Sequence, residues 1–177
     1  MRFHVAQLLK DGIGATRSYE VHEPDAVVAD DGSRGLVEGT LSLLRTKSGI
    51  LAKAALRLHY PDVCSRCLTP IKVPLELQIE EEYQPTVDVL TGAASPRPED
   101  PSVFLIDEHH VLDLTEAVRQ YRVLAAPMQP LCRPDCAGLC PVCGQNLNES
   151  PCACPRDEYD PQWSALAKLA RGEPRDN

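Results

Sequence analysis

Hydrophobic and polar side chains alternate in the middle of the chain with the period of two that is typical of a β-strand. Over residues 71–80 the polar positions include Lys72, Glu76, Gln78 and Glu80, and the apolar positions are Ile71, Val73, Leu75, Leu77 and Ile79. Because neighbouring strand residues point to opposite faces, the pattern predicts a strand with one buried and one solvated face. Pro74 lies on the solvated face and predicts that the strand is at an edge of its sheet.

Two more apolar-rich runs precede this strand, at residues 36–45 and 50–59, and the polar turn between them, residues 46–49, ends in glycine. Since the turn is short, the two runs predict a pair of antiparallel strands. The sequence Cys64-Ser-Arg-Cys67 lies between the second run and the strand at 71–79. This pair of thiols is therefore predicted at the tip of an antiparallel hairpin.

The periodicity changes to that of a helix after residue 112. Asp113 is predicted to cap the helix, Glu116 to complete a capping box, and Leu112 to pack onto Ala117 as a hydrophobic staple. Apolar residues then recur at helical spacing until Pro127 ends the pattern. The predicted core-facing set is Leu114, Ala117, Val118, Tyr121, Leu124 and Ala125.

The end of the chain predicts one more helix. Asp160 is its expected N-cap, Pro161 its first residue and Gly172 its end. Its expected apolar stripe consists of Trp163, Leu166, Leu169 and Ala170.

Together these elements predict an α+β fold with a β-rich core. We expect a twisted antiparallel sheet of five or six strands, open or partly closed into a barrel, with the helix from Asp113 packed across it. A short strand at residues 103–106, after a proline-rich loop, completes the set. We divide the chain into a core domain at residues 1–130 and a cysteine-rich zinc-binding segment with the C-terminal helix at residues 131–177.

Cysteines are the clearest chemical signal in the chain. Six of the eight lie between residues 132 and 154, and the other two form the hairpin pair. Thiolates spaced by two or three residues suit a tetrahedral Zn²⁺, because a tight turn can direct both sulfurs to one point about 2.3 Å away. Eight thiolates predict two ions, and the candidate ligands are Cys64, Cys67, Cys132, Cys136, Cys140, Cys143, Cys152 and Cys154.

Two groupings of these ligands are consistent with the spacing. In the first, Cys64 and Cys67 join Cys132 and Cys136, and the remaining four thiols make a second site. In the other, Cys132 and Cys136 join one of the other couples, which leaves a single site and spare thiols. We favour the first grouping because it leaves no thiol without a partner and ties the β-rich half to the C-terminal segment.

Other uses of the thiols are weighed against zinc. An iron–sulfur cluster stays open, since four-cysteine sites also hold iron. The spacing of Cys136, Cys140 and Cys143 matches radical S-adenosylmethionine enzymes, but the chain lacks the large barrel that follows that motif. A thioredoxin-like dithiol at Cys64 and Cys67 would need a helix, whereas a β pattern follows. Closed zinc sites leave no open position for a substrate, so the sequence predicts a protein that is not an enzyme.

Charge limits the partners. The formal net charge is −8, and two Zn²⁺ ions with eight thiolates would make it about −12. So acidic a chain is not expected to bind bulk nucleic acid. No apolar run is long enough for a membrane span and no signal peptide is evident, so we expect a cytoplasmic protein with reduced thiols.

The order of these features resembles the YceD family, the large ribosomal RNA subunit accumulation proteins of bacteria and plastids. The resemblance covers roughly residues 36–170. It rests on Cys-Ser-Arg-Cys-Leu at the hairpin tip, the strand that runs into Glu80-Glu-Glu-Tyr83, the helix Asp113-Leu-Thr-Glu-Ala-Val and the cysteine block, which includes Cys140-Pro-Val-Cys143-Gly-Gln-Asn146-Leu-Asn148. It also favours the first grouping, because some members of the family lack only the distal cysteines.

The resemblance implies a non-catalytic role in biogenesis of the large ribosomal subunit, through accumulation or processing of its RNA. The implied partner is the precursor subunit, the large-subunit ribosomal RNA or an assembly protein. Three arginines near the cysteines, Arg66, Arg133 and Arg156, are candidates for contact with RNA phosphates, and the alternative is that they are ordinary surface residues. The alternative function is a redox-responsive zinc–thiolate protein or chaperone, whose thiolates release metal on oxidation.

Overall fold

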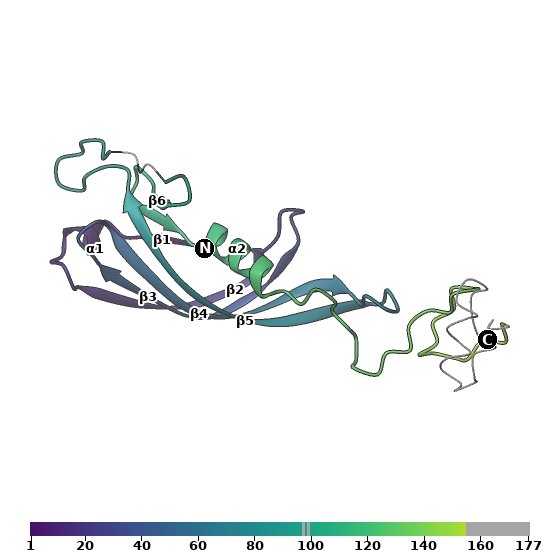
Figure 1. Ribbon diagram of the computed structural model, residues 1–177. Coiled ribbons are helices and arrows are strands. Elements are labelled where there is room, and N and C mark those ends of the chain that lie inside the picture. The colour runs from purple at the N-terminus through teal and green to yellow at the C-terminus, as the bar shows by residue number, and fades with distance from the viewer. Residues whose placement is uncertain (97, 99, 155–177) are drawn as a thin grey trace, which may run out of the picture.

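The chain folds around one curved seven-stranded sheet with the strand order β1-β7-β6-β5-β4-β3-β2. The structure is a computed structural model, and it describes residues 1–96, 98 and 100–154. Its elements are β1 Arg2–His4, α1 Ala6–Lys10, β2 Thr16–Val27, β3 Arg34–Arg45, β4 Ile50–Val63, β5 Pro70–Pro85, β6 Phe104–Ile106, β7 Val111–Asp113 and α2 Thr115–Ala125. Helix α2 lies in the concave side of the sheet (Figure 1).

The three predicted long strands are confirmed as β3, β4 and β5, each a few residues longer than expected. Burial alternates along β4, where Ala52, Leu56 and Tyr60 are buried, and Lys53 and Arg57 are exposed. The apolar positions of β5 face the same side as those of β4, because the strands pair in register from Ile50↔Tyr83 to Val63↔Pro70. The apolar faces of the two strands together line the concave side that α2 covers.

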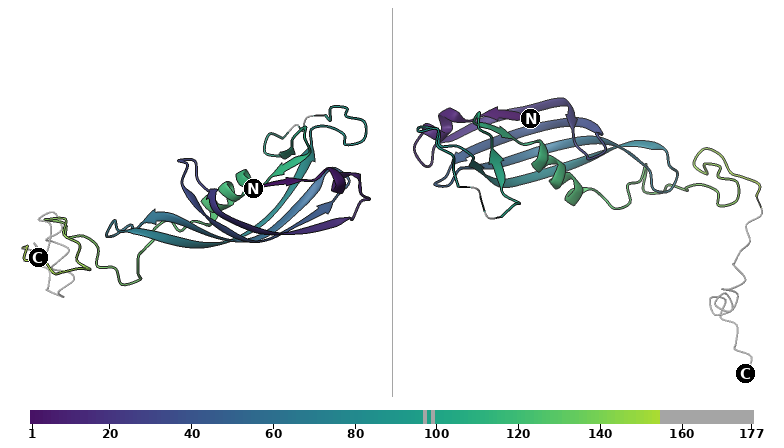
Figure 2. Two further views of the ribbon diagram at one scale, coloured as in Figure 1. Left: turned by 180° about the vertical axis from the view of Figure 1, so that it is seen from behind. Right: turned by 90° about the horizontal axis from the view of Figure 1, so that it is seen from above.

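The sheet differs from the expected antiparallel sheet of five or six strands in one pairing and in its strand number. Strand β6 runs parallel to the end of β5, with Tyr83 opposite Phe104. Strand β1 adds to the other side of β7. The sheet curls into half a barrel (Figure 2), and the rings of Phe3 and Tyr19 bring its two end strands into contact, with centroids 5.2 Å apart.

The hairpin of β4 and β5 projects beyond the rest of the sheet as a two-stranded arm (Figure 1). Pairing between β3 and β4 ends at Leu36↔His59, so the last four residues of β4 pair with β5 alone. On its other side, β5 has a strand neighbour only from Tyr83 onwards. Pro74 therefore lies on an edge, as predicted, and Cys64 and Cys67 are carried to the tip of the arm.

Asp113 was predicted to be the N-cap of helix α2, but the N-cap is the next residue, Leu114. Asp113 ends β7, and its Oδ1 accepts a hydrogen bond from the Thr115 N–H at 2.9 Å. Glu116 does not complete a capping box, because its carboxylate pairs with Arg119 and with the Gln120 amide, which is 2.8 Å away. The helix ends at Ala125, two residues before Pro127, as predicted.

The predicted apolar face of α2 is correct for its first two turns only. Leu114, Ala117 and Val118 are buried, whereas Leu124 is 81% exposed, as the helix leaves the concave side of the sheet before its last turn. Arg122 takes the inward position there, and its guanidinium carbon lies 4.2 Å from the centre of the Tyr60 ring. The predicted C-terminal helix from Asp160 lies outside the described residues, and the division of the chain at residue 130 stays a prediction.

Gly39 marks a place where β3 and β4 approach closely. Its φ is +148°, and a Cβ there would lie 2.1 Å from the Ala55 carbonyl oxygen. We expect Gly39→Ala to lower the free energy of unfolding by about 2–3 kcal/mol, because the two strands must separate to admit the methyl group. Urea unfolding measures the change, and Gly12→Ala is the control, since nothing lies within 4 Å of that position. Equal stability of the two variants would contradict the close approach.

Candidate metal centres

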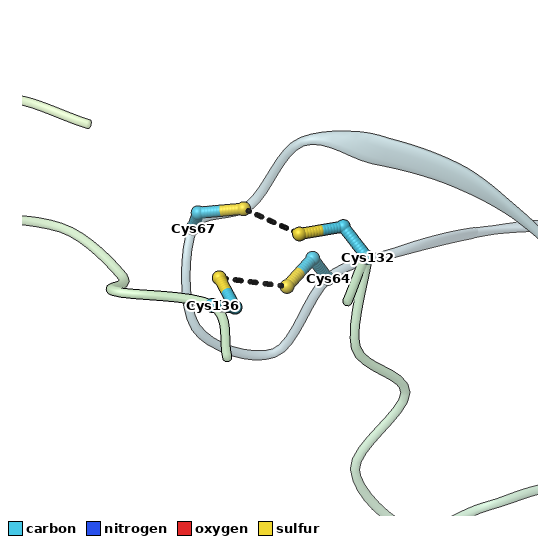
Figure 3. A group of neighbouring side chains, drawn as sticks. All are labelled: Cys64, Cys67, Cys132 and Cys136. Atoms are coloured by element: carbon cyan, nitrogen blue, oxygen red, sulfur yellow. Dashed lines mark hydrogen bonds between the residues drawn. The ribbon is translucent and has the colours of Figure 1, made fainter. Parts of the chain in front are cut away.

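The eight cysteines form two clusters of four sulfurs. Within each cluster all sulfur atoms lie within 4.8 Å of one another. The proximal centre, at the tip of the β4–β5 arm, consists of Cys64, Cys67, Cys132 and Cys136 (Figure 3). The distal centre consists of Cys140, Cys143, Cys152 and Cys154. These clusters have the membership of the first grouping, and each can hold a metal ion.

The sulfur separations fit a tetrahedral ion. The Sγ atoms of Cys64 and Cys136 are 3.7 Å apart, and so are those of Cys67 and Cys132. Four sulfurs placed about 2.3 Å from a central Zn²⁺ would be separated by about 3.8 Å. Two of the six sulfur separations in the proximal centre therefore match a four-cysteine zinc site, and the others are no longer than 4.8 Å.

The proximal centre is more deeply buried than the distal one. Cys64, Cys67 and Cys136 are at most 5% exposed, and Ile71, Leu131 and Leu139 pack against them, whereas the fourth ligand, Cys132, is exposed. In the distal centre Cys140 is buried, Cys143 is exposed, and the other two thiols are half-buried. Apolar cover limits the access of water and competing ligands to a metal site, so the proximal centre is the better protected of the two.

The same turn presents the first two thiols of each centre. The N–H of Leu68 donates to the Cys64 carbonyl at 2.9 Å, and the N–H of Gly144 donates to the Cys140 carbonyl at the same distance. Leu68 and Gly144 both have positive φ, at +58° and +74°. The chain thus uses the same metal-binding turn twice, once at each of these Cys-x-x-Cys pairs.

One thiol of each centre is held in a place that favours the thiolate. Burial opposes ionisation of Cys64, but surrounding backbone N–H groups, that of Cys67 foremost, lower its pKa to about 6. The backbone N–H groups of Cys143 and Val142 likewise lower the pKa of Cys140 to about 6. Each turn therefore contains one thiol that ionises readily to the thiolate form, which binds cations.

Another thiol of each centre resists ionisation. Burial and the neighbouring thiols raise the pKa of Cys132 to about 12. The thiol of Cys143, together with burial, raises the pKa of Cys154 to about 12. Four thiolates at such separations need a positive ion among them, and this is the demand that a divalent metal meets.

The amino-acid sequence matches a known family over two thirds of its length. Residues 52–170 match the family model described as large ribosomal RNA subunit accumulation protein YceD. The chain belongs to the YceD family. The matched region of this YceD-family chain includes all eight cysteines, the β4–β5 arm and helix α2.

Relatives of this YceD-family chain occur in mycobacteria. A protein of Mycobacterium tuberculosis and one of Mycobacterium bovis, both named as uncharacterized, are each 28% identical over 154 residues, which is 84% of this chain and 70% of theirs. A Mycobacterium leprae protein is 27% identical over 106 residues, 60% of this chain and 46% of its own. No solved structure matches the chain. Among the described residues no helix is long and apolar enough to cross a membrane.

The arginines predicted to contact RNA have partners within the protein. Arg66 donates from Nη1 to the Cys136 carbonyl at 3.0 Å, and Arg133 donates from Nη2 to Asn148 Oδ1 at 2.8 Å. Arg156 lies outside the described residues. Contact between these arginines and RNA stays a prediction, and replacing Arg66 would also remove a bond that joins the arm to the cysteine-rich segment, residues 131–154.

Sequence reasoning missed two residues that contact the sulfurs. The Thr69 hydroxyl lies 3.3 Å from the Cys67 sulfur, and its hydrogen bonds lower the pKa of that thiol. Asn148 Nδ2 lies 3.4 Å from the Cys136 sulfur. The signals in the sequence were a threonine two residues after Cys67 and the pair Asn146-Leu-Asn148 between two ligands of the distal centre.

Proposed function

We propose that this protein is a non-catalytic, zinc-binding factor that supports biogenesis of the large ribosomal subunit in the cytoplasm. The observation that carries this proposal is the YceD family match across residues 52–170, which includes both cysteine clusters. The family takes its name from accumulation of the large ribosomal RNA subunit. The role in ribosome biogenesis is inferred from the family match, and zinc binding is inferred from the chemistry of the cysteine clusters.

Zinc is the proposed ion at both centres. All-thiolate clusters of tetrahedral size suit zinc, and closed four-cysteine sites hold structure in place. Burial of Cys64, Cys67 and Cys136, each at most 5% exposed, supports this structural role over a redox switch, because an oxidant has little access to three of the four ligands, and only Cys132 is exposed. With every position occupied by sulfur, neither centre would leave room for a substrate, which supports a non-catalytic role.

The proposed partner is the precursor of the large subunit, its ribosomal RNA or an assembly protein bound to it. Two hydrogen bonds hold the arm against the chain from residue 130 onwards and are expected to stiffen this end: Ser65 donates its N–H to the Pro130 carbonyl at 2.8 Å, and Arg66 donates to the Cys136 carbonyl. A rigid end reduces the ordering entropy that binding costs. Such an end supports docking on a particle by shape and local contacts, which suits a chain of net charge −8.

Loss of the protein is expected to lower the ratio of large- to small-subunit ribosomal RNA in cells, because the large subunit would accumulate less well. The ratio is measured in cells that lack the protein and in cells rescued with wild type or with Cys140→Ser/Cys143→Ser. Wild type should restore the ratio, and the double variant should not, since it cannot fill the distal centre. Cells rescued with Gln145→Ala are the control for changes in the distal loop. An unchanged ratio in the deletion strain would reject the ribosomal role and leave the metal centres without an assigned process.

A further inference from the structure

Asn148 belongs to the distal centre by sequence and to the proximal centre by contact. It lies between Cys143 and Cys152, both in the distal cluster. Its side chain nevertheless reaches Cys136, and Nδ2 lies 3.4 Å from the sulfur. The residue is half-buried. The side-chain amide of Asn148 thus lies between the proximal and the distal centre.

The orientation of this amide is set by its other partners. Oδ1 of Asn148 accepts the backbone N–H of Ala137 and the Nη2–H of Arg133, both at 2.8 Å. Since these two groups can only donate, the amide oxygen must face them, and Nδ2 must face the sulfur. Asn148 therefore donates a hydrogen bond to Cys136, the kind of contact that stabilises a thiolate.

The loop of the distal centre holds Asn148 in this place. Leu139 and Asn146 form an antiparallel bridge, and the Cys140 N–H donates to the Gln145 carbonyl at 2.8 Å. Asn146 Oδ1 then accepts both the N–H of Asn148, at 3.1 Å, and its Nδ2–H, at 2.7 Å. Cys140 and Cys143 lie inside this hairpin, and Cys152 and Cys154 follow Asn148, so the distal thiols flank the residues that place the amide. We therefore expect the position of Asn148 to depend on what those thiols bind.

We propose that Asn148 couples the two centres, so that metal in the distal centre tightens metal binding at the proximal one. This inference rests on the proposed function, in which both clusters bind zinc. An ordered distal loop holds the amide against Cys136, where the hydrogen bond orients the sulfur and offsets its charge. Partners of this kind are worth about 10- to 100-fold in metal affinity. Coupling between sites is reciprocal, so the proximal metal stabilises the distal site by the same factor.

The test measures the zinc affinity of the proximal centre in the full chain by competition with a chromogenic chelator. Cys64→Ser identifies the proximal ion as the one it loses, and Cys140→Ser/Cys143→Ser identifies the distal ion. Asn148→Asp keeps an oxygen for Ala137 and removes the donor to Cys136. We expect Asn148→Asp to weaken the proximal centre by about 10- to 100-fold. We expect Cys140→Ser/Cys143→Ser to weaken it by a similar factor, although it leaves all four proximal ligands in place.

The combined variant separates coupling from two independent effects. Asn148→Asp added to Cys140→Ser/Cys143→Ser should weaken the proximal centre by no more than about twofold further, because the contact is already lost. Gln145→Ala is the matched control, since its side chain contacts only Ser150 within the distal loop. Wild-type proximal affinity in Asn148→Asp, or a full second loss in the combined variant, would overturn the coupling alone. A wild-type chain that holds no zinc would overturn the proposed function together with it.

Discussion

Cys64→Ser is expected to reduce the zinc content from two ions to one per chain and to release the cysteine-rich segment from the β4–β5 arm. Cys64 is fully buried, and its sulfur lies 3.7 Å from that of Cys136. Serine in its place leaves only three sulfur ligands, which do not enclose the ion. The curved sheet should remain folded, because its core cluster contains none of the cysteines. Atomic absorption measures the zinc, and limited proteolysis measures the exposure of residues 131–154.

Ser65→Ala is the matched control for this change. Ser65 stands in the same turn, and its hydrogen bond to the Pro130 carbonyl, next to the cysteine-rich segment, is donated by the backbone N–H, which the variant keeps. It should retain two ions and the proteolytic pattern of wild type. A Cys64→Ser protein that still holds two ions, with residues 131–154 still protected, would show that the sulfurs are grouped in another way.

Leu58→Ala is expected to lower the free energy of unfolding by about 3 kcal/mol, which is a large part of the stability of a domain this size. Leu58 is fully buried on the inward face of β4, among the side chains that α2 covers. Truncation there leaves a cavity that the long strands on either side, β3 and β5, cannot readily fill. Urea unfolding followed by circular dichroism gives the difference.

The same substitution at Leu124 supplies the comparison. Leu124 is 81% exposed at the end of α2, and Leu124→Ala should change stability by no more than about 0.5 kcal/mol. The two variants remove the same atoms, so the difference between them measures burial. Equal losses of stability would mean that the last turn of α2 packs against the sheet after all.

The sequence predicted the parts of the fold in which one face meets water and the other meets the core. Strands β4 and β5 alternate strictly for this reason, and both were found. Strand β2 was missed, because only Val21 and Ala26 are buried among its twelve residues, so no alternation marks it. Strands β1 and β7, of three residues each, are too short to show a period.

Helix α2 shows where periodicity stops being informative. The apolar residues continue at helical spacing through Leu124, but the concave side of the sheet against which they would pack ends one turn earlier. The pattern of residues along the chain does not show where a sheet ends. The grouping of the metal ligands was easier to predict than the end of the helix. Each thiol must share an ion with other thiols, and this requirement leaves few possible groupings. The contact of Asn148 with Cys136 was not predictable, since it exists only after the distal hairpin is closed.

The distance along the chain between the two halves of the proximal centre has a consequence for synthesis. Cys67 and Cys132 are separated by 65 residues, and ribosomes add about 5–20 residues per second, so the arm waits roughly 3–13 s for its partner thiols. Strand β1 is without its partner for longer still, because it pairs with β7, and Arg2 lies opposite Asp113. During this interval Cys64 and Cys67 form an open dithiol on a nascent chain. A metal ion can be enclosed by four sulfurs at the proximal centre only after Cys136 has been synthesised, so we expect Cys64 and Cys67 to depend until then on a reducing environment.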